Sequence, residues 1–238
     1  RLGHVTLSVP LDAEGLDVRD LSRSQAELAY ITPSHQFPTG LSMPVGRRTA
    51  LLHWASAAGR CLIEDDYDSE FRYASRPLPA LQGMDGGQKV VYIGTFSRSL
   101  APGLRVAYMA LPESLLARYE AVRLRSGDAV SRFEQHALAE LIAQGHYARH
   151  LRRAASAYQA RCRELCSLLL KIPGSDIRGQ DAGLHFLFSI RGRNETELIE
   201  KARQAGIPLR GLNEYRAQAP CPQALVLGFA GLQDERLE

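Results

Sequence analysis

The chain has 238 residues, of which 45% are hydrophobic, and its 29 basic and 26 acidic residues leave a formal net charge of only +3. This length and apolar content suffice for a large buried core, whereas the balanced charge argues against nucleic-acid binding by the chain itself. It has no apolar run near the ~20 residues of a membrane helix and no signal-peptide pattern, so we expect a cytoplasmic protein without a membrane partner. The four cysteines lack the paired spacing of a zinc site, and we expect idle thiols and no metal.

The first half of the chain alternates short apolar runs with helical patterns. The run at 90–95 is continuously apolar, as in a strand buried on both faces. The segment 44–58 carries apolar residues at helical spacing behind Pro44, a residue suited to a first helical turn. We expect strands at 4–10, 28–32, 61–66, 90–95 and 104–111, helices at 20–27 and 44–58, and a further helix opening at 112. This alternation predicts an α/β fold with a mainly parallel, doubly wound sheet.

The second half begins with a long helical pattern from 131 to 170, in which apolar residues recur every three or four positions. We interpret it as a spine that joins two parts of the molecule. Beyond Gly174 the pattern predicts a strand, a helix and a strand, at 184–190, 195–205 and 224–229. We therefore divide the chain into a large α/β part at 1–130, the helical spine at 131–172, and a small C-terminal α+β domain at 173–238.

An acidic segment lies at the end of the strand expected at 61–66. Asp65 and Tyr67 are two residues apart, so their side chains project from the same face. A carboxylate in this position can keep a pyridine nitrogen protonated, and a phenol beside it can contact a hydroxyl on the same ring. Taken alone, this motif favours the simpler interpretation of a helix cap or a cation-binding cluster.

A second group of polar residues follows the strand expected at 90–95. Thr95 and Ser97 lie on the turn that leaves this strand, and Arg105 follows a Pro-Gly turn. Hydroxyl groups together with a guanidinium make a good site for a dianionic phosphate, since arginine offers a fork of donors to phosphate oxygens. Serine and arginine near a turn are common, so this group by itself does not establish a site.

Three motifs in a fixed order change that balance, namely Thr32–Gly40, Ile63–Phe71 and Gly94–Arg105. Together they resemble the cofactor site of fold type I pyridoxal phosphate enzymes, and most closely the aminotransferase-like domain of MocR-type transcription regulators of the GntR superfamily. The resemblance is strongest from Ile31 to Leu111. It implies that the large domain is incomplete, because the family's first strands and glycine-rich turn would precede Arg1.

The resemblance implies pyridoxal 5'-phosphate as the cofactor. It makes Asp65 the partner of the pyridine nitrogen and Tyr67 the partner of the ring hydroxyl. The residues that match phosphate ligands are Thr95, Ser97 and Arg105. The loop from Ser34 to Gly40 matches the stretch that packs beside the ring, most clearly in Pro38-Thr39-Gly40. Arg98 departs from the family, because it occupies the position of the lysine that binds the cofactor covalently. A guanidinium with a pKa above ~12 cannot replace that lysine, and Lys89, Lys171 and Lys201 lie elsewhere in the chain.

The resulting hypothesis is an effector and cofactor sensor from a MocR-type regulator, with transamination impaired by Arg98. Its expected partners are an amino acid or amine effector, a second copy of the chain in a homodimer, and DNA through an upstream domain absent from this chain. Arg210, in the loop before the final strand, is a candidate for binding a substrate carboxylate. Two alternatives remain at this point: a genuine aminotransferase in which Arg98 is a change from lysine, and a dimerisation module without cofactor.

Overall fold

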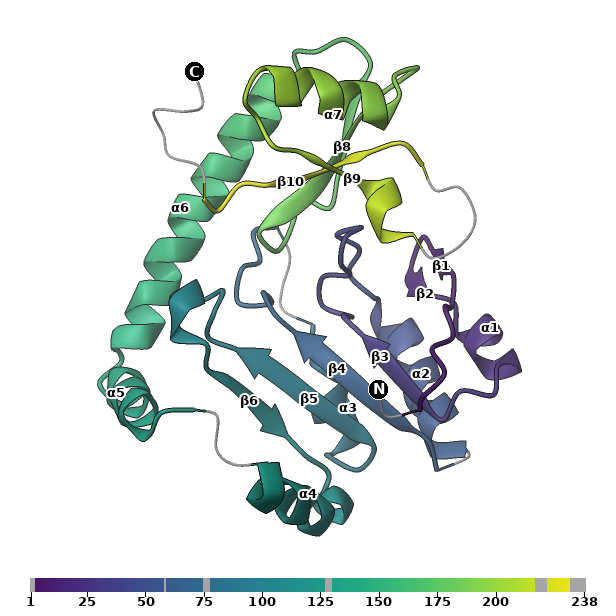
Figure 1. Cartoon of the computed structure of the whole chain (residues 1–238), viewed down its shortest axis with the longest axis vertical. Helices are drawn as coiled ribbons and strands as arrows, with labels where there is room; N and C mark the ends of the chain where they lie inside the picture. The colour runs from purple at the N-terminus through teal and green to yellow at the C-terminus, as the bar shows by residue number, and fades with distance from the viewer. Residues whose placement is uncertain (1–2, 58, 75–77, 127–129, 217–221, 232–238) are drawn as a thin grey trace.

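Two four-stranded sheets and a long helix that runs beside both make up the framework of the chain (Figure 1). They are seen in a computed structural model that describes residues 3–57, 59–74, 78–126, 130–216 and 222–231. The first sheet has the order β3-β4-β5-β6 and the second the order β7-β8-β10-β9. No helix among these described residues is long and apolar enough to cross a membrane.

The first sheet is mainly parallel, as its alternation of strands and helices predicts. Its strands are β3 (Leu28–Ile31), β4 (Cys61–Asp66), β5 (Val90–Thr95) and β6 (Ala107–Ala110). The pairs β3-β4 and β4-β5 are parallel, and β6 returns antiparallel to β5. The carboxyl ends of β4 and β5 therefore meet at one edge, and their arrowheads point toward the second sheet in Figure 1. In open α/β sheets this edge is where ligand sites form.

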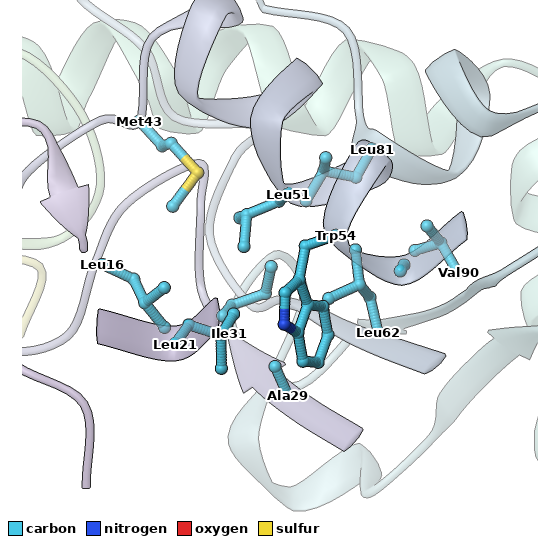
Figure 2. Packing of buried hydrophobic residues seen from close by; sticks show 11 residues of the cluster. Leu16, Leu21, Ala29, Ile31, Met43, Leu51, Trp54, Leu62, Leu81 and Val90 are labelled. Carbon is cyan, nitrogen blue, oxygen red and sulfur yellow. The ribbon is translucent and has the colours of Figure 1, made fainter. Parts of the chain in front are cut away.

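A hydrophobic core lies on one face of the first sheet, against helices α2 (Val45–Ala57) and α3 (Leu81–Asp85) (Figure 2). Leu51 and Trp54 of α2 pack here against Ile31 and Leu62. β3 alternates accordingly: Ala29 and Ile31 are buried, whereas Leu28 and Tyr30 are exposed. Successive side chains of a strand point to opposite faces, so each strand offers one face to this core and the other to the opposite side.

The second sheet is antiparallel throughout and has its own core. Its strands are β7 (Ser175–Arg178), β8 (His185–Ile190), β9 (Arg210–Gly211) and β10 (Leu225–Gly228), with helix α7 (Glu195–Gln204) and the 3-10 turn η2 (Leu212–Tyr215). Phe186 and Phe188 of β8 pack with Leu225, Phe229 and Cys162, and the last of these comes from the long helix α6.

The segment from 131 to 170 is two helices rather than one. α5 (Arg132–Ala143) ends before Gly145, which adopts a left-handed φ of 72°, and α6 (His146–Leu169) then begins. Near its start Tyr147 donates a hydrogen bond to Ser99 Oγ at 2.9 Å, and further along Cys162 joins the core of the second sheet. α6 therefore contacts the turn that follows β5 and the core of the second sheet. α4 (Glu113–Ser126) precedes this pair and buries no side chain, and the turn η1 (Pro102–Leu104) leads into β6.

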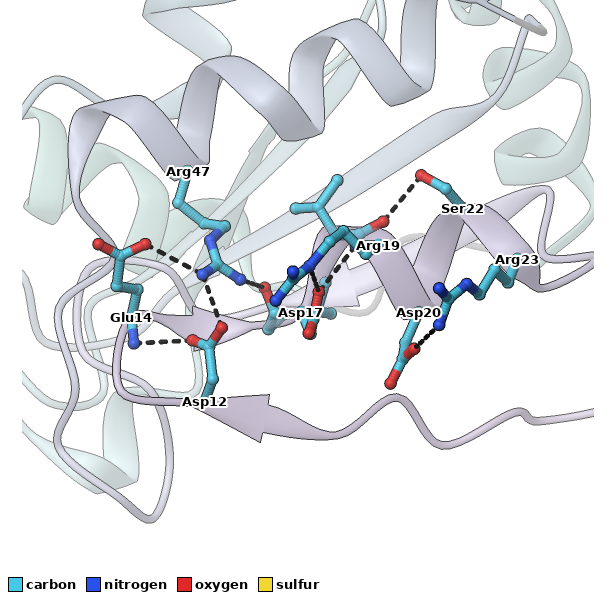
Figure 3. Close-up of polar contacts among 10 residues, drawn as sticks. Asp12, Glu14, Asp17, Arg19, Asp20, Ser22, Arg23 and Arg47 are labelled. Atoms are coloured by element: carbon cyan, nitrogen blue, oxygen red, sulfur yellow. Dashed lines mark hydrogen bonds and ion pairs between the residues drawn. The ribbon is translucent and has the colours of Figure 1, made fainter.

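The strand expected at 4–10 is not formed. Val5 and Leu7 are exposed, and none of the strands in the described part of the chain pairs with this stretch, although its alternation favours a strand. The chain instead makes a short hairpin of β1 (Leu11–Asp12) and β2 (Gly15–Leu16), then α1 (Val18–Arg23), which ends earlier than expected. Arg47 of α2 holds this hairpin through Asp12 at 2.7 Å, Glu14 at 3.0 Å and a backbone carbonyl (Figure 3).

Candidate functional site

A cavity of about 930 Å³ lies between the carboxyl edge of the first sheet and the second sheet. This volume lies in the range of cofactor and drug-sized ligand sites. Its wall includes the polar residues that the sequence singled out: Asp65, Tyr67, Thr95, Ser97, Arg98, Arg105 and Arg210. Gln36 and Phe37 of the predicted loop Ser34 to Gly40 line it, whereas the clearest part of that loop, Pro38 to Gly40, is not part of the lining. The structure thus brings together groups that are far apart in sequence.

Asp65 lies on the cavity face of β4, between two buried acidic neighbours, Glu64 and Asp66. The alternation of the strand explains the difference, because Glu64 points to the core while Asp65 points away from it. Tyr30 of the neighbouring strand β3 donates its phenolic hydrogen to the carboxylate of Asp65. Burial, reinforced by this carboxylate, raises the pKa of Tyr30, so the phenol stays protonated and remains a donor.

Tyr67 is held just beyond the end of β4. Its hydroxyl donates to the backbone carbonyl of His35 at 2.7 Å. Burial raises the pKa of Tyr67, the carboxylates of Asp68 and Asp65 raise it further, and the charge of Arg98 opposes them. The phenol is therefore neutral, and because its hydrogen is donated to His35, its oxygen is left as a hydrogen-bond acceptor toward the cavity.

The turn after β5 is organised around Thr95. Its hydroxyl accepts a hydrogen bond from the Ser97 backbone N–H at 3.1 Å, and Phe96 N–H donates to the Val106 carbonyl at 3.0 Å. Arg105 has a φ of 52°, a left-handed conformation that is uncommon for a residue other than glycine. These contacts place two hydroxyls and the guanidinium of Arg105 at the same wall of the cavity.

The charge at the wall is unevenly distributed. Arg98, Arg105 and Arg210 are exposed residues of the lining, and Arg210 Nη1 donates to the Tyr215 hydroxyl at 3.4 Å. The lining carboxylates are Asp65 and Asp68, and Asp68 is buried in contact with His35. The open part of the cavity is therefore suited to a ligand with more than one anionic group.

Sequence reasoning missed part of this wall. Tyr30, Asp68, His185 and Tyr215 were not predicted as site residues, and His35 was noted only as part of a loop. Asp68 stands in the same acidic segment as Asp65, which was a usable signal. His185 gave none, because its place beside His35, with ring centroids 4.4 Å apart, depends on the docking of the second sheet.

Comparison with known proteins identifies the class to which this fold and site belong. Residues 9–238 match the family described as aminotransferase class I and II. The chain therefore belongs to the aminotransferase class I and II family. A solved structure with the same fold is LysN, an alpha-aminoadipate aminotransferase of Thermus thermophilus, complexed with N-(5'-phosphopyridoxyl)-L-leucine. It superposes with a TM-score of 0.82 at 27% identity, over 97% of this chain and 62% of LysN.

Within this class, the chain is homologous to MocR-type regulators. It is 38% identical over 229 residues to the uncharacterized HTH-type transcriptional regulator YdeL of Bacillus subtilis, covering 95% of this chain and 50% of YdeL. It is 32% identical over 238 residues to the probable rhizopine catabolism regulatory protein MocR of Rhizobium meliloti, covering 99% of this chain and 48% of MocR. The chain thus spans about half the length of these relatives. The predicted family and fold class are confirmed.

Proposed function

We propose that this chain binds pyridoxal 5'-phosphate without a covalent bond and serves as the effector-sensing domain of a MocR-type regulator. The observation that carries the proposal is the wall of one cavity, which combines Asp65, Tyr67 and Arg105 with Arg98 and contains no lysine among its described residues. The relatives that carry the words HTH-type transcriptional regulator or regulatory protein in their names support the regulatory part.

The groups at the wall fit the chemistry of this cofactor. Asp65 would pair with the ring nitrogen, and the Tyr67 oxygen would accept a hydrogen bond from the ring hydroxyl. Thr95, Ser97 and Arg105 would hold the phosphate through hydroxyl donors and a charge-assisted fork. When bound, pyridoxal phosphate supplies an electron-withdrawing ring and an aldehyde. The residues of this chain supply the charges and donors that orient it.

Arg98 decides between sensing and turnover. Family enzymes bind the aldehyde through a lysine, whereas the guanidinium of Arg98 stays protonated and cannot attack a carbonyl. Lys89 precedes β5, at the opposite end of that strand from the cavity, Lys171 follows α6 and Lys201 lies in α7, so none of them supplies an amine at the wall. We therefore assign the site to reversible binding, with transamination impaired.

The effector and the partners follow from the same reasoning. Arg210, at the wall formed by the second sheet, is the group that we propose to bind a carboxylate of an amino acid effector. α4 buries no side chain and exposes Leu116, Val122 and Leu124, and Phe133 of α5 is also exposed. Such an apolar surface supports association with a second copy of the chain. We propose that DNA is bound by a separate domain of the regulator, as the names of the relatives suggest.

Titration with pyridoxal phosphate, followed by borohydride reduction and mass spectrometry, tests this function. The wild-type chain should change the absorbance of the ligand reversibly and give no adduct on residues 95–105. Arg98→Lys should give an adduct at position 98 only when the family's opening strands are also supplied, and the matched variant Arg98→Gln should give none. A reduced adduct on the wild-type chain would instead support a genuine aminotransferase. Absence of any binding would leave only the dimerisation module.

A further inference from the structure

A buried polar cluster lies at the inner end of the cavity. His35, Asp68 and His185 are exposed by only 1%, 1% and 7%. His35 Nδ1 lies 2.9 Å from Asp68 Oδ2, and the His35 ring packs against His185. Asp68 is ionisable and almost fully buried, so a hydrogen bond to the histidine N–H compensates part of its lost hydration.

His35 also determines where Tyr67 points. The Tyr67 hydroxyl donates to the His35 backbone carbonyl at 2.7 Å, and it lies 3.4 Å from Nδ1 of the same residue. The ring of His35, buried and hydrogen-bonded to Asp68, anchors this residue in the loop and so limits the movement of the backbone carbonyl that receives the Tyr67 hydrogen. Asp68 thus contacts the ring of His35, and the carbonyl of His35 contacts the Tyr67 hydroxyl. These two contacts together set the orientation of the phenol.

The same carboxylate is tied to the second sheet. Leu184 N–H donates to Asp68 Oδ2 at 3.2 Å, so one oxygen holds both His35 and the start of β8. Gly183 adopts a φ of 70°, and a Cβ built there would lie 2.0 Å from His35 Nδ1 and 2.5 Å from Asp68 Oδ2. Only a glycine leaves room for this approach. The Gly183 N–H donates a hydrogen bond to the Phe71 carbonyl at 2.7 Å, and this bond also holds the segment before β8 in place.

We infer that His35, held by Asp68, is a positioning residue for Tyr67, and that Asp68 couples this position to the docking of the second sheet. The inference rests on the proposed function, because the phenol that it positions is the one that would contact the ring hydroxyl of the cofactor. It adds a role for His35 of the first motif and Asp68 of the second, two residues to which the resemblance assigned none.

A metal ion is the competing explanation of the cluster. Ligating atoms of His35, Asp68 and His185 lie within 4.8 Å of one another. Zinc bonds of about 2.0–2.2 Å would require these atoms to come closer together. Nδ1 of His35 is already hydrogen-bonded to Asp68, and the backbone at Gly183 is packed against it. The geometry therefore favours a hydrogen-bonded positioning network.

The test places 3-fluorotyrosine at position 67 only and records its ¹⁹F NMR spectrum without ligand. The wild-type chain should give one narrow resonance. His35→Ala should broaden or split it, because the backbone carbonyl that accepts the Tyr67 hydrogen is no longer anchored to Asp68 through the side chain of residue 35. His35→Asn should largely restore a single resonance, since its amide can donate to Asp68 in the place of Nδ1. His53→Ala, at an exposed histidine of α2, is the control and should match the wild-type spectrum.

Ligand binding gives the second readout. His35→Ala should raise the dissociation constant for pyridoxal phosphate roughly three- to tenfold, the change expected for one neutral hydrogen bond. Asp68→Asn, which keeps the shape of the side chain, serves if His35→Ala does not fold, and it should broaden the same resonance. A folded His35→Ala or Asp68→Asn with the wild-type spectrum would overturn the inference, as would a rise in melting temperature on adding Zn²⁺ alone. If the wild-type chain bound no pyridoxal phosphate, the proposed function would fail while the NMR result still judged this inference.

Discussion

Glu64 and Asp65 are adjacent carboxylates on one strand, and their surroundings are opposite. Glu64 is fully buried, accepts the N–H groups of Leu81 and Gln82 at 3.0 Å each, and lies 3.7 Å from the guanidinium of Arg48. Asp65 faces the cavity, where its described partner is the hydroxyl of Tyr30. A single residue of offset on a β-strand therefore separates a structural carboxylate from one that is available to a ligand.

The comparison teaches how to interpret the acidic segment after β4. Burial raises the pKa of Glu64, and the two N–H donors and Arg48 oppose that rise. Arg48 in turn donates to the carbonyls of Met43, Pro33 and Pro79 and so holds the start of the loop that carries His35. On the core face Glu64 has two N–H donors and a cationic neighbour, whereas the cavity face keeps its polar groups accessible.

Removing the cationic partner of the buried Glu64 should have the largest effect on stability. Arg48→Met leaves the Glu64 carboxylate buried without its cationic partner, and removal of one member of a buried pair costs about 3–5 kcal/mol. Urea unfolding should show this loss in the free energy of unfolding. The control is Arg23→Met, which removes an exposed ion pair with Asp20 and should cost under about 1 kcal/mol. Similar losses of unfolding free energy for Arg48→Met and Arg23→Met would contradict the view that Glu64 on the core face depends on its partner.

A smaller effect on stability should come from His185. This residue is buried, as Glu64 is, and it also lines the cavity, as Asp65 does. Burial, with the neighbouring His35, lowers its pKa from 6.5 to about 4. As the pH falls through this interval, the unfolded chain binds a proton that the folded chain refuses, so stability declines by up to about 3 kcal/mol. The free energy of unfolding, measured from pH 7 to pH 4.5, should decline less steeply for His185→Gln than for the wild type. An identical slope in wild type and variant would argue against a neutral, buried His185.

The open face should respond in ligand binding rather than stability. Arg105→Ala removes a charge-assisted phosphate contact of roughly 1.5–3 kcal/mol, so the affinity for pyridoxal phosphate should fall roughly 10- to 100-fold. Asp65→Asn should leave the affinity closer to that of the wild type and instead shift the absorbance of the bound ligand, because the ring nitrogen loses its ionised partner. Titrations monitored by absorbance distinguish the two variants. Equal losses of affinity would mean that the roles of Asp65 and Arg105 are not separate.

Much of the fold follows from local sequence. The strands at 61–66 and 90–95 and the helix over 44–58 are bounded by turn residues and have clear apolar patterns, and β4, β5 and α2 lie at or within one residue of these bounds. The stretch 4–10 alternates equally well, but a strand also needs a partner, which local pattern does not reveal. α3 was missed because five residues are too few for a helical period to be visible.

The candidate site, like the fold, has one part that local sequence predicts and another that depends on contacts between distant segments. Asp65 and Tyr67 are close in sequence, and the carboxyl ends of parallel strands meet at one edge, so the cavity wall could be expected from β4 and β5 alone. The His35 cluster could not, because Asp68 and Leu184 are separated by 116 positions and meet only when the second sheet docks. The roles of the six predicted site residues remain predictions that ligand binding has to test.

α6 has a mechanical consequence. Its 24 residues span about 36 Å, and it is fixed near one end to Ser99, beside Arg98, and further along to the phenylalanines of the second sheet. One rigid helix therefore joins the turn that bears Arg98 to the core of the second sheet. The distance between these two sides of the cavity is set by the length of α6 as well as by the loops that connect the sheets.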